Sequence, residues 1–135
     1  MPPKPIKPSS TPDDFRELAL ACEGAVEGAH MGHADFRVFD RVFASLGYPD
    51  PAWGMIKLTK DEQALRLATV PGAFKPAAGA WGRHGSTMVK LDMVDSKTLE
   101  SAIAAAWVYV AAKKGKRMRK TVAKKKAIDR KKAFG

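Results

Sequence analysis

Alternating apolar and polar residues between positions 34 and 58 predict the centre of the fold. Two apolar runs are separated by Asp40 and Arg41, an arrangement typical of a β-hairpin. The apolar positions of these runs are Phe36, Val38 and Phe39, followed at every second residue by Val42, Ala44, Leu46 and Tyr48. We therefore expect two antiparallel strands here.

Further alternation predicts the rest of the sheet. After the break at Pro49–Pro51, Gly54, Ile56 and Leu58 face one way, and Met55 and Lys57 face the other. A last strand is predicted where Thr87, Val89 and Leu91 alternate with Met88 and Lys90. The segment 72–86 is rich in glycine and proline, so we expect mostly loop there, with a short strand near Phe74.

Three segments instead have the apolar spacing of amphipathic helices. The first is capped by Thr11 and ends near Gly24, and the second begins at Thr59 and stops before Pro71. The third is capped by Asp95 or Ser96 and extends to about Ala112. Their expected inward residues are Phe15, Leu18, Ala19 and Cys22, then Ala64, Leu65 and Ala68, then Leu99, Ile103, Ala106 and Val110.

This order of elements predicts a two-layer α+β sandwich, in which an antiparallel sheet has helices on one face and a partly open second face. We expect a disordered proline-rich arm over residues 1–10 and one domain over 11–112. Residues 113–135 form a tail rich in lysine and arginine, which we expect to be disordered or partly helical.

The formal net charge of +10 is concentrated outside the domain. Residues 113–135 contain 12 Lys and Arg against one Asp, which gives +11, and residues 1–10 add +2. Residues 11–112 contain 10 basic and 13 acidic residues, which gives −3. The tail is thus the part suited to a polyanion.

The sequence also predicts the cellular compartment of the protein. Its single cysteine excludes an internal disulfide, and no apolar leader or membrane-spanning stretch is evident. We expect a cytoplasmic protein without a membrane partner, with a monomer slightly favoured.

Three segments carry a resemblance to a known family: EGAHMGHADFRVFDRVFASLGY, WGMIKL and GAWGRHGSTMVKL. Over residues 11–112 the chain resembles the MmcQ/YjbR family of small bacterial proteins. The resemblance implies a frataxin-like (CyaY-like) α+β fold and a DNA-binding role through winged hairpins. The chain has GRHGST where the commoner family pattern has an aromatic and basic run before the last strand.

Aromatic and basic side chains are predicted to share the sheet face opposite the core. They are Trp53, Met55, Lys57, Met88 and Lys90, with Arg37 and Arg83 as candidate neighbours. Such a face can stack on bases and pair with phosphates, as in proteins that bind single strands. The alternative is that the segment GAWGRHG covers Trp53 and the methionines and that the lysines are only solvated. The negative charge of the domain favours this alternative.

The tail is the second candidate DNA-binding region. Its basic residues resemble lysine-rich tails that bind duplex DNA without sequence preference, and the alternative is a solvated segment with incidental charge. The candidate residues are Lys113, Lys114, Lys116, Arg117, Arg119, Lys120, Lys124, Lys125 and Lys126.

Metal and catalytic chemistry are weakly supported. His30 and His33 have a spacing that allows zinc binding, but no third ligand is evident, so turn hydrogen bonding is favoured. Cys22 is expected in the core, and Asp13, Asp14 and Glu17 are too few for a carboxylate iron site.

No catalytic constellation or cofactor motif is found. We therefore expect a non-enzymatic DNA-associated protein without a cofactor. The alternative is a small-ligand or protein-interaction module that uses the open sheet face.

Overall fold

The computed structural model describes residues 7–113, which form a two-layer α+β sandwich. Six antiparallel strands make one sheet in the spatial order β1-β2-β3-β4-β6-β5. The strands are β1 (Val26–His30), β2 (His33–Val38), β3 (Arg41–Leu46), β4 (Trp53–Lys57), β5 (Phe74–Pro76) and β6 (Ser86–Lys90). The helices are α1 (Pro12–Leu20), α2 (Lys60–Thr69), α3 (Gly79–Arg83), the short 3-10 turn η1 (Leu91–Met93) and a C-terminal helix over residues 96–113.

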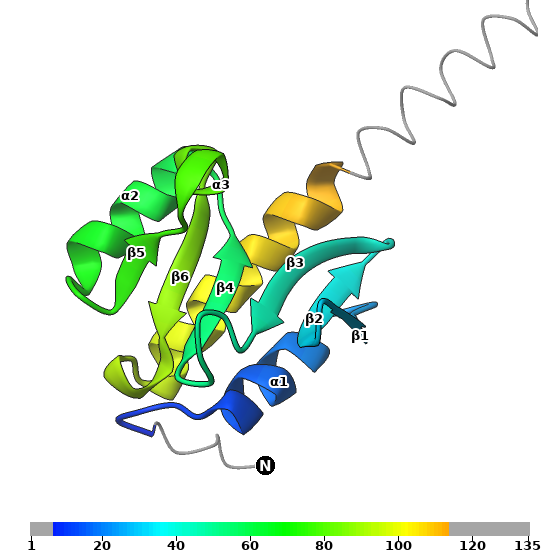
Figure 1. Ribbon diagram of the computed structural model, residues 1–135, viewed down its shortest axis with the longest axis horizontal. Helices are drawn as coiled ribbons and strands as arrows, with labels where there is room; N and C mark the ends of the chain where they lie inside the picture. Colours follow the sequence, from blue (N-terminus) through cyan, green and yellow to red (C-terminus); the bar gives the residue numbers. More distant parts are fainter. Residues whose placement is uncertain (1–6, 114–135) are drawn as a thin grey trace, which may run out of the picture.

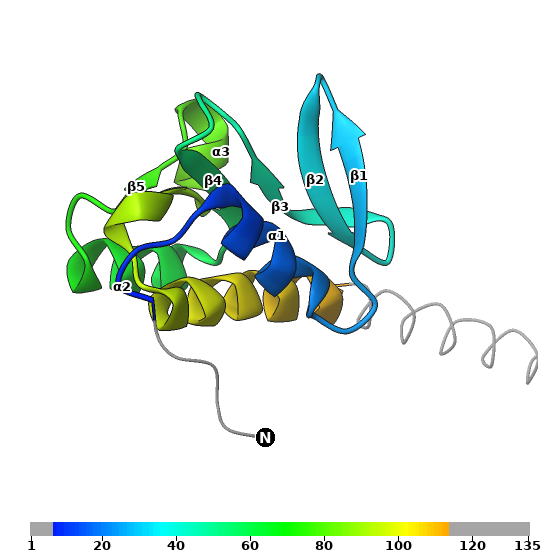
Figure 2. The ribbon, with the colours of Figure 1, turned by 90° about the horizontal axis from the view of Figure 1, so that it is seen from below.

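The layers are seen in Figures 1 and 2, where α1, α2 and the C-terminal helix lie on one side of the sheet and α3 lies on the other. The predicted fold class is therefore confirmed. Inward side chains of the sheet, α1, α2 and the C-terminal helix form one core.

Two tight hairpins organise the first three strands. Met31 and Gly32 join β1 to β2, and Phe39 and Asp40 join β2 to β3, and all four residues have positive φ. Positive φ at both central residues is the type I′ geometry that matches strand twist. The second turn lies one residue earlier than predicted, so Phe39 is 54% exposed instead of part of a strand.

Strand β1 was not predicted. It is an edge strand, paired on one side only, and four of its five residues are exposed. A strand with so little buried surface leaves no apolar alternation in the sequence. Its presence places His30 directly opposite His33 across the first hairpin.

A bulge changes the inward residues of β3. Phe36 pairs with Ala44 and Arg37 pairs with Val42, so Phe43 is an extra residue in the ladder. Phe43 and Ala44 are both buried, whereas Val42 is only half-buried. The predicted strict alternation from Val42 to Tyr48 is therefore wrong at both ends, because Tyr48 lies beyond β3 and is 55% exposed.

Side-chain caps fix the starts of α1, α2 and the C-terminal helix. Thr11 and Asp14 form a reciprocal capping box at α1, and Asp95 Oδ1 accepts a 2.6 Å hydrogen bond from the backbone of Thr98 in the C-terminal helix. All four predicted inward residues of that last helix are buried. Helix α1 ends at Leu20, earlier than predicted.

The inward face of α2 differs from the prediction. Gln63 is buried and Leu67 packs on the core, while Leu65 is 55% exposed. A polar residue is tolerated inside because its amide is hydrogen-bonded, as described below.

Residues 7–10 belong to the folded domain. The backbone N–H of Lys7 donates to Ser96 Oγ, and that of Ser96 donates to Lys7 O, both at 2.9 Å. Buried Ser10 donates from its backbone to Leu91 O and from its hydroxyl to Val94 O. The predicted disordered arm is thereby corrected for these residues, and the predictions for residues 1–6 and 114–135 lie outside the described part of the chain.

Candidate functional site

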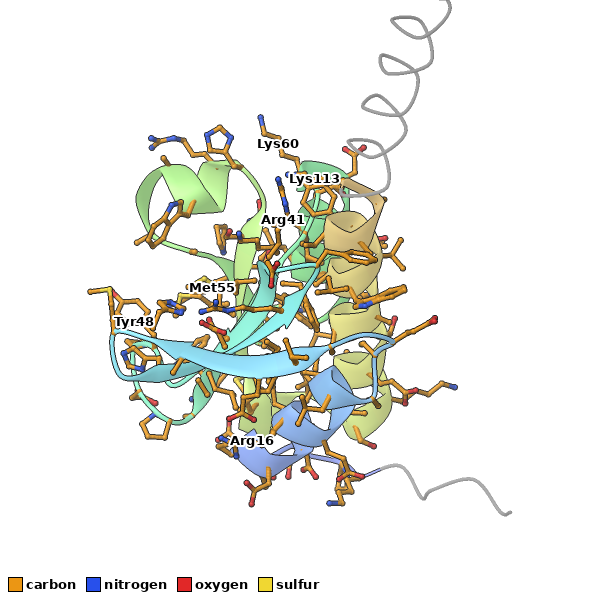
Figure 3. All side chains as sticks on the ribbon, turned by 90° about the vertical axis from the view of Figure 1, so that its right-hand side faces the viewer. Arg16, Arg41, Tyr48, Met55, Lys60 and Lys113 are labelled. Atoms are coloured by element: carbon orange, nitrogen blue, oxygen red, sulfur yellow. The ribbon has the colours of Figure 1, made fainter. Side chains whose placement is uncertain are left out.

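The sheet face turned away from α1 and the C-terminal helix is called the open face below. Cross-strand pairing aligns Asp35, Ser45, Met55, Met88 and Lys75 in one row over five strands. Paired residues project from the same face of a sheet. Figure 3 shows Met55 pointing away from the C-terminal helix, on the side of the sheet where α3 lies.

The predicted face residues do lie together. Trp53 pairs with Lys90, Met55 with Met88, and Lys57 with Ser86. Their neighbours Gly54 and Ile56 point into the core, and Gly54 leaves room for the ring of Phe15. The pairing therefore confirms that aromatic, thioether and ammonium groups share one sheet face, as the sequence predicted.

Lys75 is a further member of the open face that sequence reasoning missed. Its Nζ lies 4.8 Å from the centroid of the Trp53 ring, in a cation–π contact. The residue belongs to β5, which has only three residues. So short a strand has no periodicity that would assign its side chains to a face.

The centre of the open face is apolar and its margin is basic. Met88 is 5% exposed and Met55 and Trp53 are half-buried, whereas Lys57 and Lys75 are exposed. Long lysine stems can cover apolar surface while their ammonium groups stay in water. The face thus has a packed apolar centre with exposed cations at its margin.

The carboxylate of Asp35 is fully buried on this face and is neutralised by Arg37. The Nε of Arg37 donates to Oδ1 at 2.8 Å, and its Nη2 donates to Oδ2 at 3.0 Å. The hydrogen bonds and charge of Arg37 hold the pKa of Asp35 below its usual range, against the opposing effect of burial. The predicted phosphate contact by Arg37 therefore competes with an existing pair.

Gly28 of β1 makes room for this ion pair. A Cβ built there would lie 2.9 Å from Asp35 Oδ1 and 3.1 Å from Arg37 Nε. A larger residue would therefore force the carboxylate or the guanidinium to shift.

The two hairpin histidines take different partners. His30 Nδ1 lies 2.7 Å from Asp35 Oδ2, and since an ionised carboxylate only accepts, Nδ1 is the donor. His33 makes an edge contact with the ring of Tyr48, with centroids 6.1 Å apart. Within residues 7–113, no three His, Cys, Asp or Glu side chains group as a metal site.

Helix α3 forms a rigid support at the end of the open face where β4 finishes in Lys57. The buried amide of Gln63 donates to Gly82 O and Ser86 O, both at 3.0 Å. A Cβ at Gly82 would overlap Ala77 O at 1.8 Å, so the turn fits glycine alone at this point. Sequence reasoning predicted loop here, because five residues with two glycines lack helical periodicity.

Helix α3 carries an exposed aromatic side chain and an exposed cationic side chain. Trp81 is 71% exposed, and Arg83 and His84 are also exposed. Arg83, a candidate neighbour of the open face from the sequence, belongs to α3, and this helix lies on the same side of the sheet as the open face (Figure 2). Trp81 was not among the predicted site residues, because this segment entered the sequence analysis only as a possible cover for Trp53 and the methionines.

Of the remaining candidates, Lys113 lies within the described residues, at the end of the C-terminal helix. Lys113 Nζ lies 4.3 Å from the centroid of the Tyr109 ring, at the end of the described chain. Figure 3 places Lys113, Lys60 and Arg41 toward the same end of the molecule. The other predicted tail residues, from Lys114 onward, lie outside the described residues.

Cys22 and the aspartates at the start of α1 make contacts that stabilise the fold. Burial raises the pKa of the Cys22 thiol, whose Sγ contacts Leu18 O at 3.7 Å. Asp14 caps α1 and pairs with Lys7, and Asp13 pairs with Arg16. These contacts give both aspartates a structural role in the first turn of α1.

Comparisons with known proteins support the fold. Protein DR2400 of Deinococcus radiodurans, whose crystal structure contains the family domain DUF419, superposes with a TM-score of 0.66 at 19% sequence identity. The match covers 77% of this chain and 80% of that chain. No family model matches the sequence, and no curated protein is significantly similar to it. The two chains are thus similar in fold.

Within the described residues, no helix has both the length and the apolarity needed to span a bilayer.

Proposed function

We propose that this protein is a non-enzymatic, DNA-associated protein that binds largely without sequence preference. Its basic tail supplies most of the attraction, and the open face contributes contacts of its own. We further propose that the chain is a member of the MmcQ/YjbR family and acts in the cytoplasm.

The observation that carries this proposal is the make-up of the open face. Trp53, Met55 and Met88 form its centre, and three lysines surround them. Among the described strand residues on this face, the one carboxylate is Asp35, which is buried and paired with Arg37. The face thereby differs from the domain as a whole, whose residues 11–112 sum to −3. A locally basic face with a half-buried aromatic fits a polyanion that also carries flat bases.

The sequence of the tail supports the same conclusion. Residues 113–135 carry +11, and a lysine ammonium suits phosphates as a point charge without reading base edges. Neutralising phosphates releases counterions, so the affinity should fall steeply as salt rises.

The test is binding of the full chain and of a chain ending at Lys113 to labelled duplex and single-stranded DNA, each at two salt concentrations. Salt-dependent binding that is mostly lost with the tail supports the proposal. Absence of binding to both DNA forms at low salt contradicts it and favours the alternative, a small-ligand or protein-interaction module on the same face.

A further inference from the structure

Two accessible tryptophans mark opposite ends of the open face. Trp53 opens β4, and Lys57 closes the same strand, about 13 Å away at 3.3 Å per residue. Lys57 pairs with Ser86, which follows α3 by three residues. Helix α3, which carries Trp81, is therefore at the far end of the face from Trp53.

The exposure of Trp81 has no structural explanation in the described chain. A tryptophan that is 71% exposed contributes little to a core. Its backbone is nevertheless held firmly, by the two hydrogen bonds from Gln63 and by the close packing of Gly82 on Ala77. A large ring on a firm support loses little conformational freedom on binding, as an interaction anchor requires.

The cations lie between and beside the two rings. Lys57 and Lys75 are exposed, Lys90 is half-buried opposite Trp53, and Arg83 is exposed on α3 itself. The Lys75 ammonium lies over the Trp53 ring, so a base stacking there would displace it, and the displaced ammonium could pair with the adjoining phosphate. Aromatic rings and cations thus occur together at both ends of the face, as bases and phosphates do along a nucleic-acid strand.

The same geometry argues against a duplex as the occupant of this face. Bases in a duplex are stacked on each other and cannot cover an aromatic side chain, whereas unpaired bases can. The major groove of about 12 Å admits a helix or a two-stranded ribbon, not a broad sheet.

We infer that the open face and α3 together bind single-stranded nucleic acid, with bases stacked on Trp53 and Trp81 and phosphates paired with Lys57, Lys75 and Lys90. This inference rests on the proposed function, since it names the form of nucleic acid that the domain selects. The tail adds electrostatic attraction that does not distinguish single-stranded from double-stranded nucleic acid.

The experiment compares the full chain with its Trp81→Ala, Trp81→Phe, Trp53→Leu and Val108→Ala variants. The probes are a labelled oligothymidine, a labelled duplex of equal length, and inorganic polyphosphate, which has charge but no bases. Val108 is the matched control because it is 57% exposed on the C-terminal helix, on the opposite side of the sheet. Thermal unfolding of each variant checks that it is folded, and Trp81→Ala keeps the test valid if Trp53→Leu is unstable.

We expect the full chain to bind oligothymidine more tightly than duplex at equal salt. Trp81→Ala and Trp53→Leu should each weaken oligothymidine binding by at least about fivefold, the lower end for loss of one stacked base. Trp81→Phe should restore most of the loss, and Val108→Ala should have no effect. Binding of polyphosphate should be the same for all five chains, because stacking is not involved.

The inference is overturned if the tryptophan variants bind oligothymidine as tightly as the unchanged chain, or if duplex is preferred. In that case salt-dependent binding to both DNA forms would leave the proposed function intact. Absence of binding to either DNA form overturns both.

Discussion

Arg37 holds the buried carboxylate of Asp35 with two hydrogen bonds, of 2.8 Å and 3.0 Å, on the open face of the sheet. His30 contacts the same carboxylate at 2.7 Å from across the first hairpin. The Asp35–Arg37 ion pair lies within β2 and removes the negative charge that would otherwise repel a polyanion from this face, and the His30 contact joins β1 to β2.

We expect this pair to make stability depend on pH. Because the folded-state pKa of Asp35 is lowered, its contribution is present above the unfolded pKa of about 3.9 and is lost as the pH falls through the lower folded value. Asp35→Asn should therefore lower the unfolding midpoint near neutral pH, and the difference from the unchanged chain should shrink below about pH 4. Urea unfolding of both chains, from neutral pH to below about pH 4, measures this difference in the unfolding midpoint.

The control for this prediction is Asp92→Asn, at an exposed position in η1. It should leave the midpoint near that of the unchanged chain at each pH. A loss in Asp35→Asn that is equal at every pH would show that packing, not the charge of Asp35, is responsible.

Ile103→Ala should destabilise the domain by about 2–5 kcal/mol, the usual range for emptying a buried aliphatic site. Ile103 is 1% exposed at the centre of the C-terminal helix, between that helix and the sheet. Val108→Ala, one turn further on and 57% exposed, should change the free energy of unfolding by about 0.5 kcal/mol or less. Equal unfolding midpoints for the two variants would contradict the docking of this helix.

Much of this architecture could be predicted because the deciding signals are local. Thr11 caps α1 through a hydrogen bond within one turn, and the four inward residues of the C-terminal helix repeat at helical spacing. Trp53, Met55 and Lys57 were assigned to one face because strand alternation needs no knowledge of distant partners.

What could not be predicted depends on pairing between distant residues. The bulge that buries Phe43 exists only in the register between β2 and β3. Lys75 reaches Trp53 through the pairing of β5 with β6, and α3 is held by Gln63, about twenty positions earlier in the sequence. The Asp35–Arg37 pair was missed as a unit because two residues of opposite charge on a strand are usually solvated.

We predict that the chain has no tight zinc site at His30 and His33. His30 is engaged with Asp35 and His33 contacts Tyr48, so the two imidazoles would have to leave different partners to share a metal. Two histidines without a third ligand hold zinc weakly. Stoichiometric zinc that survives dialysis, and that is lost in His33→Ala, would contradict this.

A chain ending at Lys113 should remain folded with little change in melting temperature. Within residues 7–113, the last buried residue of the C-terminal helix is Val110, and Lys113 contacts the ring of Tyr109. A large drop in melting temperature on truncation would show that residues after 113 pack on the domain.

The most direct test of the proposed function is a salt titration of duplex binding by the full chain and by the chain ending at Lys113. If about half of the basic tail residues contact phosphates, log K for the full chain should fall against log salt with a slope of roughly −5. The shortened chain should bind duplex weakly and lose most of that slope. If the shortened chain keeps most of the affinity, or discriminates strongly between unrelated duplexes, the domain and not the tail is the main duplex-binding element.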